Sequence, residues 1–413
     1  MSDSGEVSAY DRMVWPEGQV EQWLVSGEHR RELQAYFGEA EYASLRALAI
    51  VAARVSPDPE RVVFFVPGIM GTQLALARER PEPDNLLWLD PSDIHHGNLT
   101  LLTMPGKTLI ASGPVLYTWL PLKLALAAAG YTMRCFVYDW RLDMNDSAAA
   151  LAVQLAACTA RELRLVGHSM GGLIAHAVLR EPAGERVRQL ITLGTPHGGS
   201  FAPVQAVRGV YPLVRRLAQL DPLHSPEALS REVFASFHSL YQMLPRDIQG
   251  DLIDPRNWPR SGPQPNATVL ARAPLFKPGD PDPRIQTIAG HGYLTTTNVA
   301  NVDGEFWYRY DYAGDGTVPA TRAVLPGCRA WYCQVAHNEL PRDPAVHAAL
   351  IALLKGRNPA LAAEPPARHD APVSTSDTEL RRQLTGKLNW MQMDSAQRRL
   401  FLDSLNSPPP QAR

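Results

Sequence analysis

The feature that most constrains this chain is a serine flanked by glycines directly after an apolar run. The run covers residues 163–166, the sequence GHSMGG follows at 167–172, and apolar residues at helical spacing come after it. A serine on a sharp turn between a strand and a helix needs glycine on both sides, because neighbouring β-carbons would collide there. We therefore expect Ser169 to be a nucleophile at a helix N-terminus, where the Met170 amide can bind a developing oxyanion. The adjacent His168 is interpreted as structural.

Further apolar runs of strand length recur along the chain, with helical segments between them. They lie at residues 62–66, 133–138, 190–193, 285–289 and 330–335. Alternating strands and helices predict a parallel sheet joined by right-handed crossovers. Together with the serine turn, this pattern predicts an α/β-hydrolase fold: a mostly parallel sheet flanked by helices.

The acid that would accompany the serine should follow it in the chain, because α/β-hydrolase triads run in the order Ser, Asp or Glu, His. Asp315 lies between Gly314 and Gly316, which would allow a tight turn to present its carboxylate. Asp311 and Asp303 lack such flanking glycines. We expect Asp315 to be the acid and keep Asp311 as the alternative.

Three histidines follow the predicted acid: His337, His347 and His369. His337 comes directly after the predicted strand at 330–335, whereas His347 lies inside a predicted helix and His369 in a Pro-rich stretch. We therefore expect His337 to take the proton from Ser169 and pass it to the leaving alcohol.

A second oxyanion donor is expected in the loop after the early strand beside the serine turn. The sequence PGIMG at 67–71 occupies that place, and its central amide belongs to Ile69. We assign the oxyanion hole to Ile69 and Met170. The alternative is that 67–71 is only a glycine-rich turn.

The chain divides into segments of different character. We expect a helical N-terminal appendage over 1–56 and a hydrolase domain over 57–356. Within that domain, residues 200–284 are irregular and rich in proline, which is typical of a cap or lid. A Pro/Ala/Ser-rich linker is expected over 357–377 and a helical tail over 378–413. The apolar stretches 45–55 and 115–133 are interpreted as core helices, because charged residues or proline interrupt them.

Five segments of the chain match one family pattern. They are VPG at 66–68, YDWR at 138–141, GHSMGG at 167–172, TPHGG at 195–199 and GDGTVP at 314–319. Through these five segments the chain resembles the lecithin:cholesterol acyltransferase family, which includes phospholipid acyltransferases and a phospholipase A2 with transacylase activity. The resemblance covers about residues 61–355 and places the same residues in the triad and the oxyanion hole.

The resemblance also implies a lipid substrate. Leu87, Trp88 and Leu89 look like the family's lipid-engaging region, and the insertion at 200–284 looks like its cap. The alternative is that these apolar residues belong to the core, since large exposed apolar patches are uncommon. Exported, disulfide-bonded members differ from this chain, whose cysteines do not lie around Trp88.

Composition limits the remaining function classes. Apolar residues make up 45% of the chain, and a formal net charge of -2 gives no basic footprint for nucleic acid.

The polar, acidic N-terminus does not resemble a signal peptide, so we expect a cytoplasmic protein with at most peripheral membrane contact. The four cysteines are expected to be reduced. No His/Asp/Cys spacing indicates a metal, and no cofactor is expected.

The sequence thus predicts a serine-dependent lipid acyl hydrolase or O-acyltransferase that works through an acyl-enzyme. Hydrolysis and acyl transfer remain open. A small-ester carboxylesterase is the nearest alternative, and a non-catalytic binding protein with this fold is another. The helical termini are also candidates for contact with a protein partner.

Overall fold

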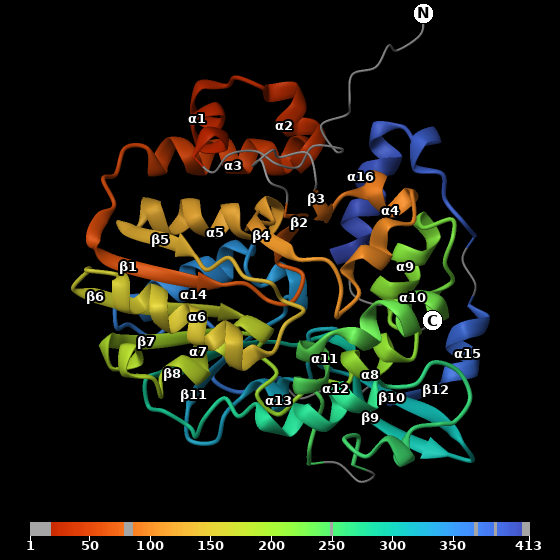
Figure 1. Ribbon diagram of the computed structural model, residues 1–413. Coiled ribbons are helices and arrows are strands. Elements are labelled where there is room, and N and C mark those ends of the chain that lie inside the picture. Colours follow the sequence, from red (N-terminus) through yellow and green to blue (C-terminus); the bar gives the residue numbers. More distant parts are fainter. Residues whose placement is uncertain (1–17, 78–85, 248–250, 367–370, 384–385, 407–413) are drawn as a thin grey trace, which may run out of the picture.

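The computed structural model describes residues 18–77, 86–247, 251–366, 371–383 and 386–406, and its centre is a six-stranded parallel sheet (Figure 1). The strand order is β11-β8-β7-β6-β1-β5, and each neighbouring pair is parallel. In chain order the strands are β1 (Asp58–Val66), β5 (Tyr131–Cys135), β6 (Glu162–His168), β7 (Val187–Leu193), β8 (Ile285–Gly290) and β11 (Arg329–Cys333). Each overlaps one of the six predicted runs, so the predicted parallel sheet is confirmed.

Alternate residues of these strands are buried against opposite layers of helices. Val62 and Phe64 of β1 belong to a cluster shared with α6 and α7, whereas Val63 and Phe65 belong to one shared with α3, α5 and α14. The helices are α3 (Glu39–Ala52), α5 (Leu116–Ala128), α6 (Met144–Ala157), α7 (Met170–Val178) and α14 (Pro344–Leu354). Burial on both faces explains why the strands read as continuous apolar runs.

The described part of the N-terminal segment, residues 18–56, is mainly helical and packs on one face of the sheet. It forms α1 (Gln19–Ser26), α2 (Arg30–Phe37) and α3. Leu24, Phe37 and Leu45 lie in the same buried cluster as Phe65 of β1. These helices therefore complete the main core.

The two long apolar stretches have different structures. Residues 45–52 lie in α3 as predicted, but the run 115–133 divides into α5 and the start of β5. Gly130, at a φ of 85°, sits between them, and this left-handed conformation ends a helix. Among the described residues, no helix is both long and apolar enough to cross a membrane.

The insertion over 200–284 consists of short helices and turns. They are α8 (Ala202–Val207), α9 (Pro212–Leu220), α10 (Pro226–Glu232), α11 (His238–Gln242) and α12 (Ala267–Arg272), with short 3₁₀ turns between some of them. Some of these elements share a buried cluster with the antiparallel hairpin of β9 (Tyr293–Val302) and β10 (Glu305–Gly314). The sequence predictions did not include this hairpin.

The segment predicted as a linker contains a strand, which corrects that prediction locally. β12 (Val373–Ser376) pairs antiparallel with β10. It is followed by α15 (Asp377–Arg382), where the Asp377 carboxylate is 2.6 Å from the Arg208 guanidinium of the insertion, and both side chains are buried. A strand of four polar or β-branched residues is too short for its pattern to distinguish it from a loop.

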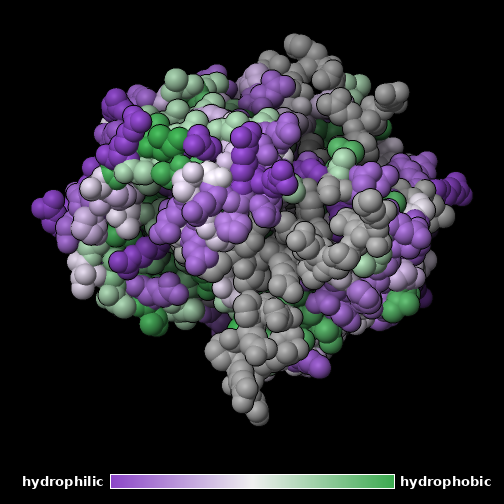
Figure 2. All heavy atoms as spheres, turned by 90° about the horizontal axis from the view of Figure 1, so that it is seen from above, coloured by the Kyte–Doolittle hydropathy of each residue, from purple (hydrophilic) through white to green (hydrophobic). Residues whose placement is uncertain are grey.

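The described part of the C-terminal tail is helical in separate pieces rather than as one helix. The 3₁₀ turn η7 (Trp390–Gln392) precedes α16 (Ser395–Asn406). Trp390, Phe401 and Leu405 are buried in the cluster that contains Val62 and Phe64 of β1. In Figure 1 α16 lies beside α4 (Pro91–His95) and α9. Seen from above, hydrophobic residues form small groups among hydrophilic ones (Figure 2).

Candidate active site

Ser169 lies at the junction of β6 and α7, in a strained backbone conformation. Its φ of 53° is positive, which is rare for a residue other than glycine. A β-carbon at position 167 would lie 2.4 Å from the Gly172 α-carbon, and one at position 171 would lie 2.1 Å from the Val66 carbonyl oxygen. The turn can therefore form only with glycine at both positions, as the sequence predicts.

The structure brings the three predicted triad side chains together. The Ser169 hydroxyl is 2.8 Å from His337 Nε2, and His337 Nδ1 is 2.7 Å from Asp315 Oδ2. All three residues are at least nine-tenths buried. In this geometry Nδ1–H donates to the carboxylate, and Nε2 is left as the acceptor for the serine proton.

The Asp315 carboxylate is fixed by its own turn. Its Oδ1 accepts hydrogen bonds from the Thr317 and Val318 amides at 3.0 and 2.8 Å. Gly314 is required because a β-carbon there would lie 2.5 Å from the Val318 carbonyl oxygen. The alternative acid, Asp311, instead accepts from the Ala313 amide.

The other candidate bases lie elsewhere. His347 is buried in α14, and its Nε2 is 2.8 Å from the Pro341 carbonyl oxygen. His369 lies outside the described residues.

His168 contacts the candidate base, a role that sequence reasoning missed. Its Nε2 donates to the His337 carbonyl oxygen at 2.9 Å, and the two ring centroids are 5.0 Å apart. Burial lowers the pKa of His168 to about 3, so the ring is neutral. His168 thus ties the loop carrying His337 to the serine turn.

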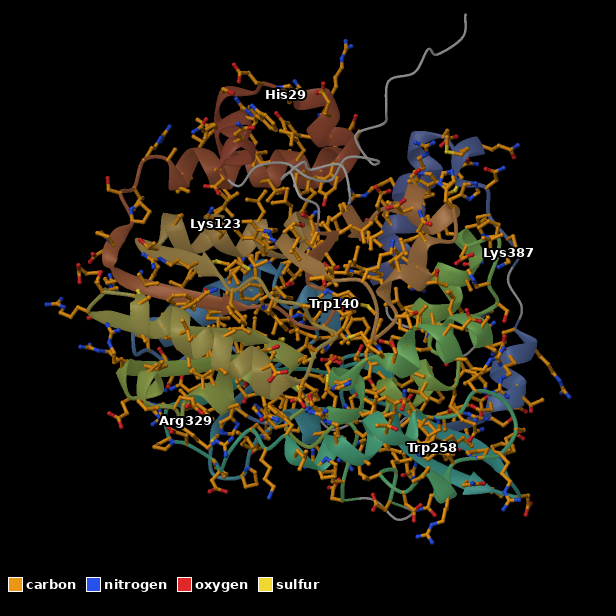
Figure 3. All side chains as sticks on the ribbon, in the orientation of Figure 1. His29, Lys123, Trp140, Trp258, Arg329 and Lys387 are labelled. Carbon is orange, nitrogen blue, oxygen red and sulfur yellow. The ribbon has the colours of Figure 1, made fainter. Side chains whose placement is uncertain are left out.

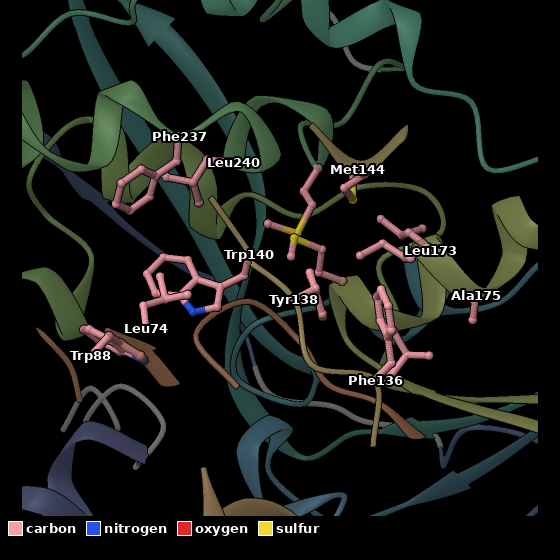
Figure 4. Close-up of a cluster of buried hydrophobic side chains, with 14 of the residues drawn as sticks. Leu74, Trp88, Phe136, Tyr138, Trp140, Met144, Leu173, Ala175, Phe237 and Leu240 are labelled. Atoms are coloured by element: carbon pink, nitrogen blue, oxygen red, sulfur yellow. The ribbon is translucent and has the colours of Figure 1, made fainter. Parts of the chain in front are cut away.

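Three buried side chains hold the loop at 67–72, which faces the serine. Tyr138 Oη donates to the Pro67 carbonyl at 2.6 Å, and Trp140 Nε1 donates to the Thr72 carbonyl at 2.9 Å. Trp88 Nε1 donates to the Met70 carbonyl at 2.8 Å. In Figure 4 the two tryptophans lie near each other, and their ring centroids are 5.5 Å apart. The YDWR segment therefore supports the candidate oxyanion loop.

The two predicted oxyanion donors belong to the two segments that meet at Ser169. Met170 is the first residue of α7, so its amide has no acceptor within the helix. Ile69 lies in the loop after β1, and both Ile69 and Ser169 line one cavity. The loop touches the serine turn closely: a β-carbon on Gly68 would be 2.9 Å from the Ser169 β-carbon.

A cavity of about 210 Å³ opens from Ser169 toward the insertion and the C-terminal helix. Its apolar lining includes Ile69, Met70, Trp88, Leu89, Val115, Leu213, Val214, Phe234, Leu240, Met243, Leu402 and Leu405. Trp88 and Leu89 therefore line the cavity, but Leu87 does not. Leu87 and Trp88 are each only 4% exposed and belong to a buried cluster, so neither lies on the outer surface of the protein.

In the part of the chain that the structure describes, no three His, Cys, Asp or Glu side chains are grouped to hold a metal ion. None of the four cysteines forms a disulfide bond in the structure.

The parallel sheet with a strained serine between β6 and α7 defines the architecture. The fold is that of the α/β-hydrolases. A family described as the PGAP1-like alpha/beta domain matches residues 150–230, which include the serine turn and α7. This family is not the one that the motifs resemble, and membership of the lecithin:cholesterol acyltransferase family remains a prediction.

Known proteins match the chain in part. The uncharacterized protein YJR098C of Saccharomyces cerevisiae is 30% identical over 115 residues, which is 27% of this chain and 17% of that protein. The mature lipase BlEst2 of Bacillus licheniformis is 17% identical, with a TM-score of 0.37, covering 72% of this chain and 94% of that chain. The metagenomic carboxyl esterase MGS0156 is 14% identical, with a TM-score of 0.38, covering 73% of this chain and 77% of that chain.

Proposed function

We propose that this protein is a serine-dependent acyl-ester hydrolase or O-acyltransferase, with Ser169, His337 and Asp315 as its catalytic residues. The observation that carries the proposal is the continuous hydrogen-bonded series from Ser169 Oγ through both His337 ring nitrogens to Asp315. A binding protein would have no need for this series together with a strained serine, since strain persists only where the surrounding structure maintains it.

In the proposed mechanism, Ser169 Oγ attacks the ester carbonyl while His337 Nε2 accepts the serine proton. Asp315 fixes the tautomer and stabilises the charged imidazole. The amides of Ile69 and Met170 would hold the tetrahedral oxyanion. His337 then protonates the leaving alcohol, and the acyl group stays bound to Ser169 as an ester. Water or another alcohol attacks this ester to complete hydrolysis or acyl transfer.

A lipid ester is the proposed substrate class because the cavity beside Ser169 is lined mainly by apolar side chains. A long acyl chain would displace ordered water from such a surface. Tyr36, Tyr117 and Arg399 give the cavity a polar part, where an alcohol or headgroup could bind. A small-ester carboxylesterase would use the same triad and remains the second candidate.

Peripheral contact with a membrane is proposed at the C-terminal helix, which lines this cavity through Leu402 and Leu405. Leu400 of the same helix and Met391 before it are 70% and 63% exposed. Contact of a helical terminus with a protein partner is proposed as well. Sedimentation with phospholipid vesicles tests the membrane contact: a Leu400→Asp/Met391→Asp variant that sediments like the wild type contradicts it.

The proposed activity is tested by incubating the protein with mixed phospholipids, neutral glycerides and short p-nitrophenyl esters, followed by mass spectrometry. Free fatty acid alone indicates hydrolysis, and an acylated alcohol indicates transfer. A fluorophosphonate probe should label the wild type and not Ser169→Ala, which should lower turnover by about 10⁶. Activity of Ser169→Ala near the wild-type level would overturn the assignment.

A further inference from the structure

A second concave surface lies at the N-terminal ends of the parallel strands, whereas Ser169 lies at their C-terminal ends. This groove has a volume of about 770 Å³ and is lined by the amino-terminal parts of the sheet strands and by residues after α14. Seven cationic side chains line it: Arg61, Arg164, Arg188, Arg284, Arg329, Lys355 and Arg357. In Figure 3 Arg329 lies to the lower left of Trp140, whose indole supports the candidate oxyanion loop. We refer to these seven residues as the basic groove.

The cations on the floor of the basic groove are held in place. Arg61 donates to the Tyr131 hydroxyl at 2.9 Å, and its guanidinium lies 4.4 Å from the centre of that ring. Arg164 donates to Glu162 at 2.8 Å, and Arg188 reaches the same carboxylate at 3.3 Å. The hydrogen bond from Arg164 lowers the pKa of Glu162, which therefore stays ionised. One carboxylate is thus shared by several guanidinium groups.

The cations on the rim have no such partners. Arg329, Lys355 and Arg357 are exposed. Their side chains make no hydrogen bond or ion pair within the described part of the chain. The whole chain has a net charge of -2, so this concentration of positive charge is local. Like charges in a concave surface repel one another, and such a surface focuses its field on an incoming anion.

The shape and position of the basic groove limit what can bind there. Guanidinium groups suit phosphate because they donate paired hydrogen bonds to its oxygens. A flat membrane would not enter a concave groove, and a membrane docked at this edge would lie away from the cavity beside Ser169. The concave shape and the distance from the cavity beside Ser169 both favour a small soluble ligand over a membrane.

We propose that the basic groove binds a soluble small molecule carrying two or more linked phosphate groups, of the nucleoside di- or triphosphate class. Arg61 and Arg164 would provide a fixed floor for one phosphate. Arg329, Lys355 and Arg357 would close on the other from the rim. The proposal does not depend on the chemistry at Ser169, so the Ser169→Ala protein should bind equally well.

Isothermal titration calorimetry of the full chain with pyrophosphate and with ATP tests this proposal. We expect saturable binding of both that weakens as salt is raised. The variant R329Q/K355Q/R357Q should raise the Kd at least about tenfold, because it removes three unpaired cations from the rim. The matched control R30Q/R31Q/R54Q removes three exposed arginines, two from α2 and one from the turn after α3, and should keep the wild-type Kd.

Three outcomes would overturn the proposal. The first is the absence of binding heat with either ligand. The second is an equal rise of Kd in both triple variants, which would indicate a general charge effect. The third is binding only to vesicles that contain anionic phospholipid, which would assign the groove to a lipid headgroup. Thermal unfolding of both variants shows whether they are folded, and exposed positions should leave the melting temperature unchanged.

Discussion

The indole Nε1 of Trp88 donates a hydrogen bond to the Met70 carbonyl oxygen at 2.8 Å, and this contact relates a buried tryptophan to the candidate oxyanion loop. The sequence suggested that Trp88 engages lipid. In the structure it lines the cavity with part of its ring while its polar atom fixes the backbone one residue after Ile69. An oxyanion donor is effective only when it is held in place before the charge develops.

Trp88→Phe should therefore reduce catalysis more than it reduces stability. Phenylalanine keeps the apolar ring but lacks the N–H, and losing a hydrogen bond of about 1 kcal/mol should lower kcat/KM roughly fivefold. Trp258→Phe is the matched control, because Trp258 donates to the Leu252 carbonyl at 2.9 Å in a separate buried cluster. Steady-state kinetics and thermal unfolding of both variants check this. Equal kinetic losses would mean that the Trp88 contact is only structural.

Asp315→Asn should lower kcat by about 10⁴, because an amide in place of the carboxylate favours the wrong tautomer of His337. Asp311→Asn should change kcat by less than about threefold, since Asp311 contacts the Ala313 amide and not the imidazole. Single-turnover kinetics with a p-nitrophenyl ester provide the measurement. A larger loss at Asp311 than at Asp315 would move the acid to the alternative residue.

The buried His168 makes stability depend on pH. Burial lowers its pKa to about 3 in the folded protein, whereas an unfolded histidine titrates near 6.5. Between these values the unfolded state binds the proton first, so the free energy of unfolding falls as the pH decreases below about 6.5 and is unaffected above it. At pH 5 the loss from this residue should be about 2 kcal/mol.

His168→Gln should remove that pH dependence, because glutamine is neutral throughout and keeps an N–H donor. Urea unfolding at pH 7 and pH 5 should show a smaller loss of unfolding free energy for this variant than for the wild type. His29→Gln serves as the control, since His29 lies on the N-terminal helices with its side chain about half exposed. If His168→Gln and the wild type lose the same free energy, another group causes the acid sensitivity.

The parallel sheet and the meeting of the candidate triad could be predicted from the sequence because both follow from local patterns. Each sheet strand is a short apolar run, and Ser169 and Asp315 each lie beside glycines that their turns require. Because the base follows the acid in the chain order of these triads, His337, His347 and His369 were the candidates for the base. These signals lie within a few residues of the feature that they predict.

The supporting contacts could not be predicted because they join distant residues without a local pattern. His168 Nε2 meets the His337 carbonyl across 169 positions of the chain, and Asp377 meets Arg208 across the same separation. The hairpin of β9 and β10 was missed as well, since only the first half of β10 alternates between buried and exposed residues and β9 does not, so the pair lacks a continuous period-two pattern. The resemblance of YDWR to a family motif marked Trp140, but its hydrogen bond to the Thr72 carbonyl appears only in three dimensions.

The C-terminal helix offers a test of the proposed acyl site. Leu402 of α16 lines the cavity beside Ser169, whereas Leu400, two residues earlier, is 70% exposed. Leu402→Trp should fill part of the cavity and exclude long acyl chains while leaving room for short ones. We expect kcat/KM for p-nitrophenyl palmitate to fall about tenfold or more, and the value for p-nitrophenyl butyrate to stay within about twofold.

Leu400→Trp adds the same side chain to the same helix but directs it to solvent, so it should not change the ratio of the two rates. Because both variants carry the same substitution on one helix, any difference between them reports the cavity and not the helix propensity of tryptophan. An equal fall with both esters in Leu402→Trp would mean that the helix disturbs the triad. A fall restricted to palmitate would place the acyl chain between Ser169 and α16, and would favour a lipid ester over a small ester as the substrate.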